Sequence, residues 1–384
     1  MLTSSISFKN FKKKIESNKI SKTFRSIINN KNQVIESLGK NYKYSYKLKK
    51  LKKYNKISDF RIIGMGGSIL GTQAIYDFLR HKIKKNFSFV NNLQNLNLNK
   101  NKKKYLNLVV SKSGNTIETI VNSNILIKKK DSNIFITENK NNYLYKFAEQ
   151  LKSEVVHHNN FIGGRYSVLS EVGMLPAEFM GLKTSDFKQL NLLIKNKRFL
   201  NSLIKNVSSI LYYIKNKKFN SIIINYDEKS ENLFKWYQQL VAESLGKKNL
   251  GILPIVSNMP KDNHSVMQLY LDGFKNNFFT FFYVNEVKSN KINNNKILFT
   301  QRHLKNKNIS NIIYAQMKAT EKVFNKKNIP FRSFEIKRRY EKTLGELFCF
   351  FILETILIGR CLNLNPFDQP AVELIKQETK KILI

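Results

Sequence analysis

Hydrophobic positions follow two alternating periods over much of this chain. Short, mainly apolar runs at residues 60–64, 105–110 and 133–137 have the length and the β-branched or aromatic content of buried strands. Between these runs, residues 72–79 and 117–126 carry apolar side chains at the three-to-four spacing of helices that pack on one face. Because strands alternate with helices, the pattern predicts a doubly wound parallel sheet that binds its ligand at the carboxyl ends of the strands.

The second half of the chain repeats this arrangement with new segments. Helices are expected at residues 200–215 and 230–244, and strands at residues 221–226, 251–256 and 278–284. This order of elements predicts a second α/β unit.

Helical patterns mark both ends of the chain. The last part reads as an apolar helix at residues 344–362, a loop at 363–370 and a final helix at 371–384. A stretch rich in lysine and asparagine, residues 288–310, is expected to be a surface excursion. Among the many lysines of the first 55 residues, apolar side chains recur at three-to-four spacing: Phe8, Phe11, Ile15, Ile20, Phe24, Ile27 and Ile28.

The expected fold class is therefore α/β, with two doubly wound parallel-sheet domains between a helical arm and a helical tail. A chain of 384 residues exceeds one compact core, which agrees with two domains. The changes in pattern place a helical N-terminal arm at residues 1–55, a first α/β domain at 56–185, a second at 186–343 and the C-terminal tail at 344–384.

Composition narrows the class of protein further. The chain is 42% hydrophobic and 12% aromatic, which is enough for buried cores and too apolar for a disordered chain. It contains no apolar run long enough to cross a membrane, and its first residues lack the apolar core of a signal peptide. Cys349 and Cys361 lie in or beside an apolar helical stretch, so we expect buried thiols in a reducing, cytoplasmic location.

The charge is unusual, with 67 Lys and Arg against 27 Asp and Glu and a formal net charge of +40. Such a charge attracts polyanions at low salt. The lysines are dispersed among asparagines, as in residues 97–104 and 288–296, whereas a nucleic-acid binder concentrates its charge on one element. We therefore expect a mostly solvated surface, a composition that AT-rich codons alone can produce, and no specific nucleic-acid partner.

Two turns between a strand and a helix suggest a phosphate site. Residues 64–71 are rich in glycine and include Gly67 and Ser68. The second turn, residues 111–116, offers hydroxyl groups and one lysine. Backbone amides at a helix start and nearby hydroxyls donate to phosphate oxygens, although each turn alone is also typical of an ordinary capped helix. Two such turns in succession favour a phosphate pocket.

A third turn, Gly163-Gly-Arg-Tyr-Ser167, places the cationic side chain of Arg165 directly after two glycines. Glycine allows backbone conformations that other residues rarely adopt. The turn either aims Arg165 into a pocket or caps a surface carboxylate. Four further polar residues lie at element ends where proton transfer or ligand contact is feasible: Glu243, His264, Gln369 and Lys376. Each of them taken singly is more often structural.

Together these segments resemble the glucose-6-phosphate isomerase (phosphoglucose isomerase) family. The resemblance runs from about residue 60 to residue 376 and is carried by Gly-Gly-Arg-Tyr-Ser at 163–167, Ala-Glu-Ser-Leu-Gly-Lys at 242–247, Asn-His-Ser at 263–265 and Asn-Pro-Phe-Asp-Gln-Pro at 365–370. It implies two sugar-isomerase (SIS) α/β domains and a helical C-terminal tail that completes the active site. It also implies a homodimer that isomerises a sugar phosphate without metal or organic cofactor.

The resemblance also assigns roles to residues. It makes Glu243 the base that moves a proton between C2 and C1 through a cis-enediolate, and it places Arg165 beside that enediolate. His264 is expected to open the sugar ring and to reach the site from the neighbouring subunit, while Lys376 assists at the ring oxygen. The expected substrate and phosphate contacts are Gly67, Ser68, Ser111, Lys112, Ser113, Thr116 and Gln369.

Other functions remain open at this level. A dual phosphoglucose/phosphomannose isomerase also uses a Ser-x-Ser-Gly-Asn-Thr loop, and the isomerase half of glucosamine-6-phosphate synthase shares the fold but needs a glutaminase domain. A non-catalytic sugar-phosphate sensor normally carries a DNA-binding helix-turn-helix, and residues 1–55 contain no recognisable one. The leading prediction is reversible isomerisation of glucose 6-phosphate and fructose 6-phosphate, as in glycolysis and gluconeogenesis.

Overall fold

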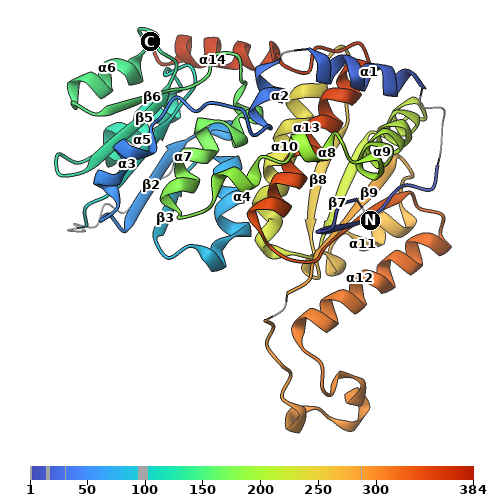
Figure 1. Cartoon of the computed structure of the whole chain (residues 1–384). Helices are drawn as coiled ribbons and strands as arrows, with labels where there is room; N and C mark the ends of the chain where they lie inside the picture. The colour runs from blue at the N-terminus through green and yellow to red at the C-terminus, as the bar shows by residue number, and fades with distance from the viewer. Residues whose placement is uncertain (1, 14–17, 31, 94–102, 287) are drawn as a thin grey trace.

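The structure is a computed structural model that describes residues 2–13, 18–30, 32–93, 103–286 and 288–384. Two lobes lie side by side, each built around one sheet, with helices packed between the sheets and over their outer faces (Figure 1). The doubly wound α/β architecture expected from the alternation of strands and helices is confirmed.

The first sheet has five parallel strands in the order β3-β2-β4-β5-β6. All three strands predicted in this half are present, and two short edge strands complete the sheet. The apolar centre of β4 is buried on both faces, as a strand inside a doubly wound sheet requires. The strands are β2 (Asp59–Gly64), β3 (Asn86–Val90), β4 (Leu106–Val110), β5 (Ser132–Thr137) and β6 (Glu154–His157).

The second sheet has the order β1-β10-β9-β7-β8, with β1 antiparallel to β10 and the other strands parallel. The helix expected around Phe8 is wrong, because Ile6–Lys9 forms the edge strand β1 and pairs with Ser333–Ile336. This strand covers one edge of the sheet. The parallel strands are β7 (Asn220–Asn225), β8 (Leu253–Asn258), β9 (Asn277–Val284) and β10 (Phe331–Ile336).

Most predicted helices are present with shifts of a few residues at their ends. Ile15, one of the apolar positions of the predicted arm, lies outside the described residues. The helices are α1 (Asn18–Asn29), α2 (Gln33–Ser37), α3 (Leu48–Leu51), α4 (Leu70–Phe78), α5 (Ile117–Leu126), α6 (Tyr143–Gln150), α7 (Glu171–Phe179), α8 (Leu190–Leu193), α9 (Lys197–Lys215), α10 (Glu231–Leu245), α11 (Met267–Asp272), α12 (Ile309–Lys326), α13 (Glu341–Cys361) and α14 (Ala371–Ile382).

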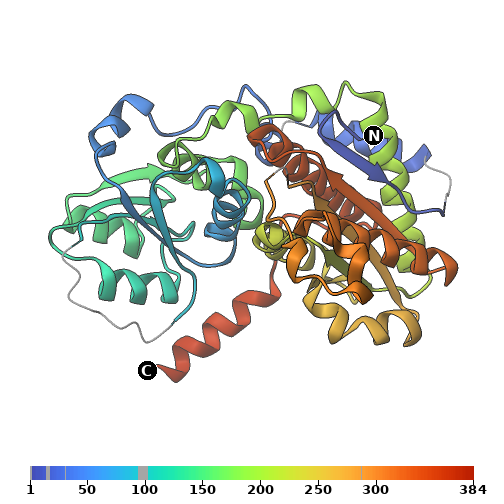
Figure 2. The same ribbon diagram turned by 90° about the horizontal axis from the view of Figure 1, so that it is seen from below.

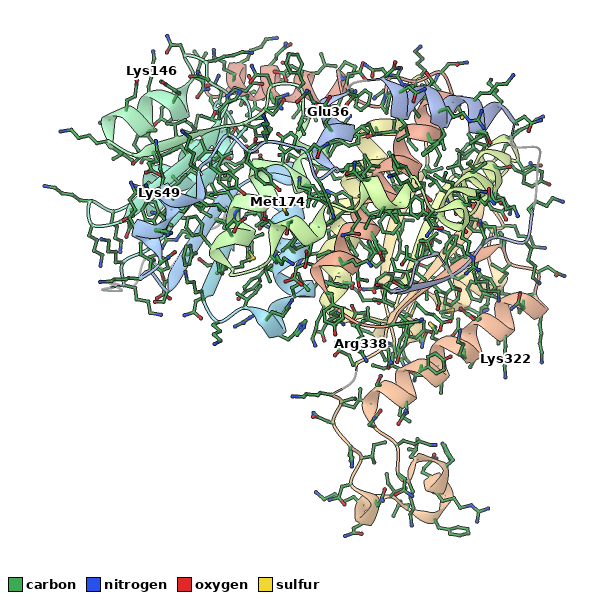
Figure 3. The ribbon with its side chains drawn as sticks, in the orientation of Figure 1. Glu36, Lys49, Lys146, Met174, Lys322 and Arg338 are labelled. Atoms are coloured by element: carbon green, nitrogen blue, oxygen red, sulfur yellow. The ribbon has the colours of Figure 1, made fainter. Side chains whose placement is uncertain are left out.

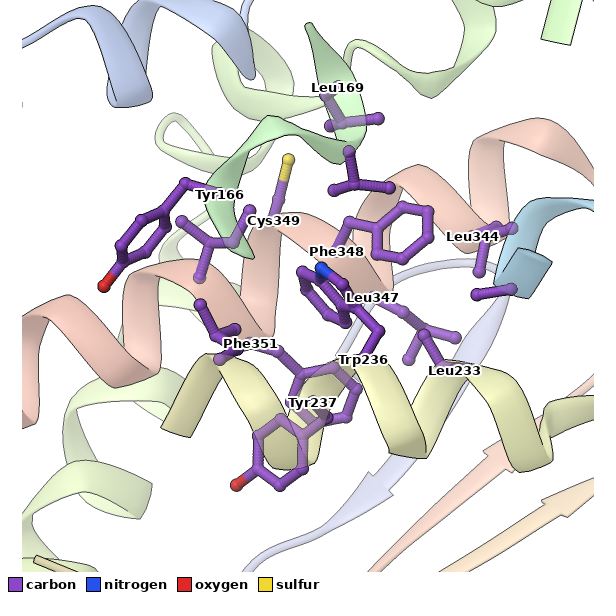
Figure 4. Packing of buried hydrophobic residues seen from close by; sticks show 14 of the residues in the cluster. Tyr166, Leu169, Leu233, Trp236, Tyr237, Leu344, Leu347, Phe348, Cys349 and Phe351 are labelled. Carbon is purple, nitrogen blue, oxygen red and sulfur yellow. The ribbon is translucent and has the colours of Figure 1, made fainter. Parts of the chain in front are cut away.

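The centre of the core lies where α10 and α13 cross between the two sheets (Figure 4). The ring of Trp236 meets that of Phe348 edge to face, with their centroids 4.8 Å apart, and both residues are fully buried. The indole nitrogen of Trp236 donates to the carbonyl oxygen of Arg165 at 3.0 Å. The largest aromatic side chain of the core thus also holds the backbone of the Gly-Gly-Arg turn.

Two parts of the chain project from this body. Residues 288–308 leave the second lobe below α12, and Leu298 and Phe299 there are 75% and 79% exposed (Figure 1). The surface excursion predicted for this stretch is confirmed. At the C-terminus, α14 buries none of its residues and extends away from the body between the two lobes (Figure 2). Among the described helices, none is both long and apolar enough to cross a membrane.

A buried lysine ties the N-terminal segment to the back of the Gly-Gly-Arg turn. The Nζ atom of Lys188 donates to the carbonyl oxygens of Ser37, at 2.5 Å, and Leu169. The same ammonium lies 4.9 Å and 4.8 Å from the ring centroids of Tyr42 and Tyr44. Burial lowers the pKa of Lys188 from 10.5 to about 7.

This lysine gives stability a pH dependence. Between about pH 7 and 10 the unfolded chain keeps the proton on residue 188 and the folded protein releases it, so stability rises with pH by up to about 1.4 kcal/mol per unit. Urea unfolding of Lys188→Met at pH 7, 8 and 9 is expected to lose that slope, whereas Lys183→Met, at a side chain 73% exposed, keeps it. An unchanged slope in Lys188→Met contradicts the assignment.

Candidate active site

Helix α10 carries Glu243 near its last turn and fixes both oxygens of the carboxylate. Oε1 accepts a hydrogen bond from Gln239 Nε2 at 2.8 Å, and Oε2 lies 3.1 Å from Arg165 Nη1. Gln239 precedes Glu243 by one helical turn, so their side chains share a face of α10. With 27% of its side chain exposed, Glu243 is held in one orientation and still reaches solvent.

Arg165 is buried, with only 1% of its side chain exposed, and each nitrogen of its guanidinium has a partner. Nε donates to Ser244 Oγ at 2.8 Å, and Nη1 donates to Glu243 and, at 2.5 Å, to Gln369 Oε1. Nη2 donates to the carbonyl oxygens of Pro366, at 2.7 Å, and Asp368, at 3.0 Å. The guanidinium is therefore a fixed positive charge beside the carboxylate, and it ties the C-terminal loop to α10.

The two glycine turns meet directly at this point. A Cβ atom on Gly67 would lie 2.2 Å from the carbonyl carbon of Gly164, and one on Gly66 would lie 2.7 Å from Nε2 of Gln239. Gly66 also has a φ of +50°, in the region that favours glycine. Glycine is thus required where the turn at residues 64–71 packs against the Gly-Gly-Arg turn.

We expect Gly67→Ala to lower kcat/KM by at least about tenfold, because the new methyl group forces the two turns apart and one misplaced group costs that much in a positioned site. The readout is the initial rate with fructose 6-phosphate. Gly163→Ala is the matched control, because that glycine has an ordinary φ of −65° and a Cβ there comes no closer than 3.8 Å to another heavy atom. Equal losses in both variants would contradict the assignment of the effect to the contact between Gly67 and Gly164.

The hydroxyl turn after β4 adjoins the first glycine turn. Gly64 and Val110 are partners in the sheet, so the chain leaves both strands at the same edge. Ser111 Oγ and Thr116 Oγ1 lie 2.9 Å apart across this turn, which begins α5. Lys112 donates to the carbonyl oxygen of Asn160 at 2.6 Å, just before the Gly-Gly-Arg turn.

The lysine of this turn is only partly free to meet a phosphate. Its Nζ atom lies 3.6 Å from Glu138, and burial lowers the pKa of Lys112. Ser113 is exposed, and its Oγ accepts from the amide of Asn115 at 3.3 Å. Ser68 lies on the neighbouring turn with a partly exposed side chain.

A cavity of about 850 Å³ opens beside the carboxylate, between the end of α10 and the C-terminal loop. Glu243 and Gln369 both line it, which brings the predicted base and the predicted glutamine together. Lys247 lies on its wall and pairs with Asp368 at 2.8 Å, closing the loop over the helix end. Its volume is typical of small-ligand pockets, but its described lining includes neither Arg165 nor the predicted phosphate contacts on the turns at residues 64–71 and 111–116.

His264 and Lys376 lie apart from Arg165 and Glu243 in the single chain. His264 ends the short helical turn Lys261–His264 and is exposed. Lys376 lies on α14, is 59% exposed and pairs with Glu373 at 2.9 Å. Within the described ranges, no hydrogen bond or ion pair connects either residue to Arg165 or Glu243.

Several contacts of the site were not predicted from the sequence. Gln239 orients the carboxylate, and its spacing of four residues before Glu243 on one helix was an available signal. Ser244 bonds both Arg165 and the hydroxyl of Tyr166, the latter at 2.8 Å. The backbone oxygens of the C-terminal loop carry no sequence signal at all.

The fold with two sheets defines a class of protein. A hypothetical protein of Thermus thermophilus superposes with a TM-score of 0.83 over 95% of this chain and 94% of its own, at 22% identity. A tagatose-6-phosphate ketose/aldose isomerase from Escherichia coli superposes with a TM-score of 0.53 over 93% and 97%, at 13% identity. The chain therefore has the two-sheet sugar-isomerase (SIS) fold of phosphosugar isomerases.

Sequence similarity defines the family within that class. The sequence model of the phosphoglucose isomerase family matches residues 16–258. A glucose-6-phosphate isomerase of Methanocaldococcus jannaschii is 32% identical over 88% of this chain and 86% of its own length. One from Campylobacter jejuni is 28% identical over 85% and 86%. The chain belongs to the phosphoglucose isomerase family, which confirms the resemblance drawn from its motifs.

Proposed function

We propose that this chain catalyses the reversible isomerisation of glucose 6-phosphate and fructose 6-phosphate. The observation that carries the proposal is the Glu243 carboxylate, held by Gln239 and Arg165 at the wall of a cavity large enough for a hexose phosphate. Such an aldose–ketose interconversion needs one base, one fixed positive charge and one anchor for the phosphate.

Glu243 is the base in this mechanism. In the open-chain aldose it takes the proton from C2, and the electron pair moves to form the enediolate between C1 and C2. The hydroxyl proton of O2 passes to O1, the same carboxyl group returns the abstracted proton to C1, and a carbonyl forms at C2, which gives the ketose. Holding the carboxylate in one orientation lets a single group serve both carbons from one face.

Arg165 stabilises the negative oxygen that forms between these two steps. A proton next to a carbonyl is weakly acidic, so the base alone is insufficient. The guanidinium is fixed before the reaction starts, and its charge lies in a buried setting where it interacts strongly with a developing oxyanion. Because the guanidinium nitrogens already have partners, Arg165 acts through its charge. It can donate a hydrogen bond to the substrate only if the bond to Gln369 breaks.

The phosphate group serves as an anchor and does not react. The hydroxyl and amide groups of the turns at Gly67–Ser68 and Ser111–Thr116 surround the edge of the first sheet that faces the Gly-Gly-Arg turn. Binding at these groups fixes the distance between the phosphate and Glu243. The reaction requires no metal or organic cofactor in this scheme.

In this scheme, His264 acts from a second subunit, and Lys376 acts after a movement of its helix. We propose a homodimer in which His264 of one chain opens the sugar ring bound by the other, because it is exposed and its described contacts do not reach the site of its own chain. Lys376 reaches the ring oxygen when α14, which buries none of its residues in the single chain, folds toward the cavity. We place the enzyme in the cytoplasm, where its two free thiols are typical.

Co-expression of two inactive variants tests the shared site. If His264 acts across the interface, Glu243→Gln and His264→Ala chains form a heterodimer with one intact site. Equal co-expression then restores about a quarter of the wild-type rate by random pairing of subunits. If both residues serve the same chain, no pairing creates an intact site, and the rate stays at the level of the single variants. Affinity tags on the two chains establish that heterodimers formed.

The direct test of the proposal is turnover of fructose 6-phosphate by the purified protein, coupled to oxidation of the glucose 6-phosphate formed. A second assay with mannose 6-phosphate separates a dual phosphoglucose/phosphomannose isomerase from a specific one. Binding of fructose 6-phosphate without turnover would make the chain a sensor and overturn the proposal.

A further inference from the structure

A second cavity lies at the end of the second sheet where its parallel strands begin. It has a volume of about 400 Å³ and lies where β10 begins and β1 ends. Its lining comes from β1 and the chain after it, from α9 and the turn after α9, and from the link between α12 and β10. The lining residues are Lys9, Lys12, Lys13, Tyr213, Lys218, Asn325, Asn328, Ile329, Pro330 and Phe331.

The charge of this lining is positive over the residues that the structure describes. Lys9, Lys12, Lys13 and Lys218 contribute four ammonium groups, and no Asp or Glu side chain is among the described lining residues. Over the part of the chain that the structure describes, none of the four forms an ion pair. The adjoining cavity differs, because Asp272 lines it and pairs with Lys327 at 3.7 Å.

Three of these lysines are held in place by groups that leave their charge unneutralised. Lys9 Nζ lies 4.6 Å from the centre of the Phe331 ring, and Lys13 Nζ lies 5.1 Å from that of Tyr212. Lys218 Nζ donates to the carbonyl oxygen of Lys275. Burial, with Lys275 as the second cause, lowers the pKa of Lys218, so an anion beside it would be stabilising.

The helix ends around the cavity do not account for this charge. Both α9 and α12 end there, and each carries about half a negative charge at its C-terminus. Lys215 and Lys326, in the last turns of these helices, already provide basic side chains for those ends. The four lining lysines are therefore in excess of what the helix ends require.

We propose that this cavity binds a small polyphosphate anion, either an inorganic polyphosphate or the phosphate chain of a nucleotide. Its volume suits a ligand of that size, and Ile329, Pro330 and Phe331 give it an apolar floor beneath the ammonium groups. Its lining shares no residue with the cavity beside Glu243, so the ligand binds together with the sugar phosphate. This inference does not rest on the proposed isomerase activity.

Calorimetric titration of the purified full chain at physiological salt tests the site with inorganic triphosphate, ATP and adenosine. The cavity variant is Lys12→Glu/Lys13→Glu, at two exposed loop lysines. Its matched control is Lys49→Glu/Lys146→Glu, at two exposed or partly exposed lysines in the first half of the chain (Figure 3). Both variants change the net charge equally, so the control removes the contribution of the chain's overall charge.

We expect triphosphate affinity to fall by at least about tenfold in the cavity variant and by less than about threefold in the control, with adenosine failing to bind. Tighter binding of ATP than of triphosphate identifies a nucleotide ligand, and equal binding identifies the phosphate chain alone. The proposal is overturned if wild-type protein does not bind triphosphate, if both variants lose affinity equally, or if saturating fructose 6-phosphate displaces the ligand.

Discussion

Replacing Glu243 by glutamine is expected to lower kcat by about 10²- to 10⁴-fold, the usual contribution of a positioned general base. The amide has the size of the carboxylate, and its oxygen can still accept from Arg165. Its NH2 can donate to Gln239 Oε1 once that side-chain amide turns over, so the site keeps its shape. The amide cannot take the C2 proton. KM for fructose 6-phosphate is expected to change by less than about threefold, because the proposed phosphate anchor lies on other turns.

Two controls separate lost chemistry from lost structure. Thermal unfolding of Glu243→Gln should match the wild type, since the replaced side chain is partly exposed. Gln239→Leu leaves the carboxylate present but removes the donor that orients it. The kcat of this variant should lie between that of the wild type and that of Glu243→Gln. A Glu243→Gln enzyme with unchanged kcat would assign the proton transfer to another residue.

The elements that could be predicted from the sequence are those whose signal is local. Helix α5 was predicted at its observed bounds, because its apolar positions and the hydroxyl-rich turn before it lie in one short stretch. The strands β2, β4 and β5 are buried on both faces and read as apolar runs.

The elements that escaped prediction depend on distant partners. The edge strand β1 exists because Ile6–Lys9 pairs with β10 near the far end of the chain. The charged side chain of Arg332 conceals β10 as a strand, yet it is fully buried against Glu354 and donates to Thr280 Oγ1 at 2.9 Å. Local sequence does not reveal such a pairing.

The same distinction holds for the site. The motif around Arg165 and the position of Glu243 are visible in sequence, but their 3.1 Å contact depends on how α10 packs against the Gly-Gly-Arg turn. The C-terminal loop reaches Arg165 mainly through backbone oxygens, which every residue has. The roles of His264 and Lys376 stay predictions, since that of His264 requires a second subunit and that of Lys376 a different placement of α14.

Replacing Arg165 by methionine is expected to lower kcat by about 10²- to 10³-fold, the loss typical of one group that stabilises a developing oxyanion. Methionine retains much of the apolar volume and removes the charge. The substitution also removes the donor to the carbonyl oxygen of Asp368 and one of the two donors to that of Pro366, which keeps the hydroxyl of Tyr166, so the C-terminal loop loosens and KM rises as well. Steady-state rates with fructose 6-phosphate measure both effects.

The two effects of Arg165 can be separated with variants that remove only one of them. Gln369→Ala deletes one loop contact and leaves the charge in place, so it should raise KM while kcat falls by less than about tenfold. Arg165→Lys keeps a positive charge but cannot reproduce the fork that holds both carbonyl oxygens. If charge dominates, Arg165→Lys recovers much of the kcat lost in Arg165→Met. The alternative is that Arg165→Lys, Arg165→Met and Gln369→Ala all have the same low kcat. In that case the arginine acts by holding the loop, and another group stabilises the oxyanion.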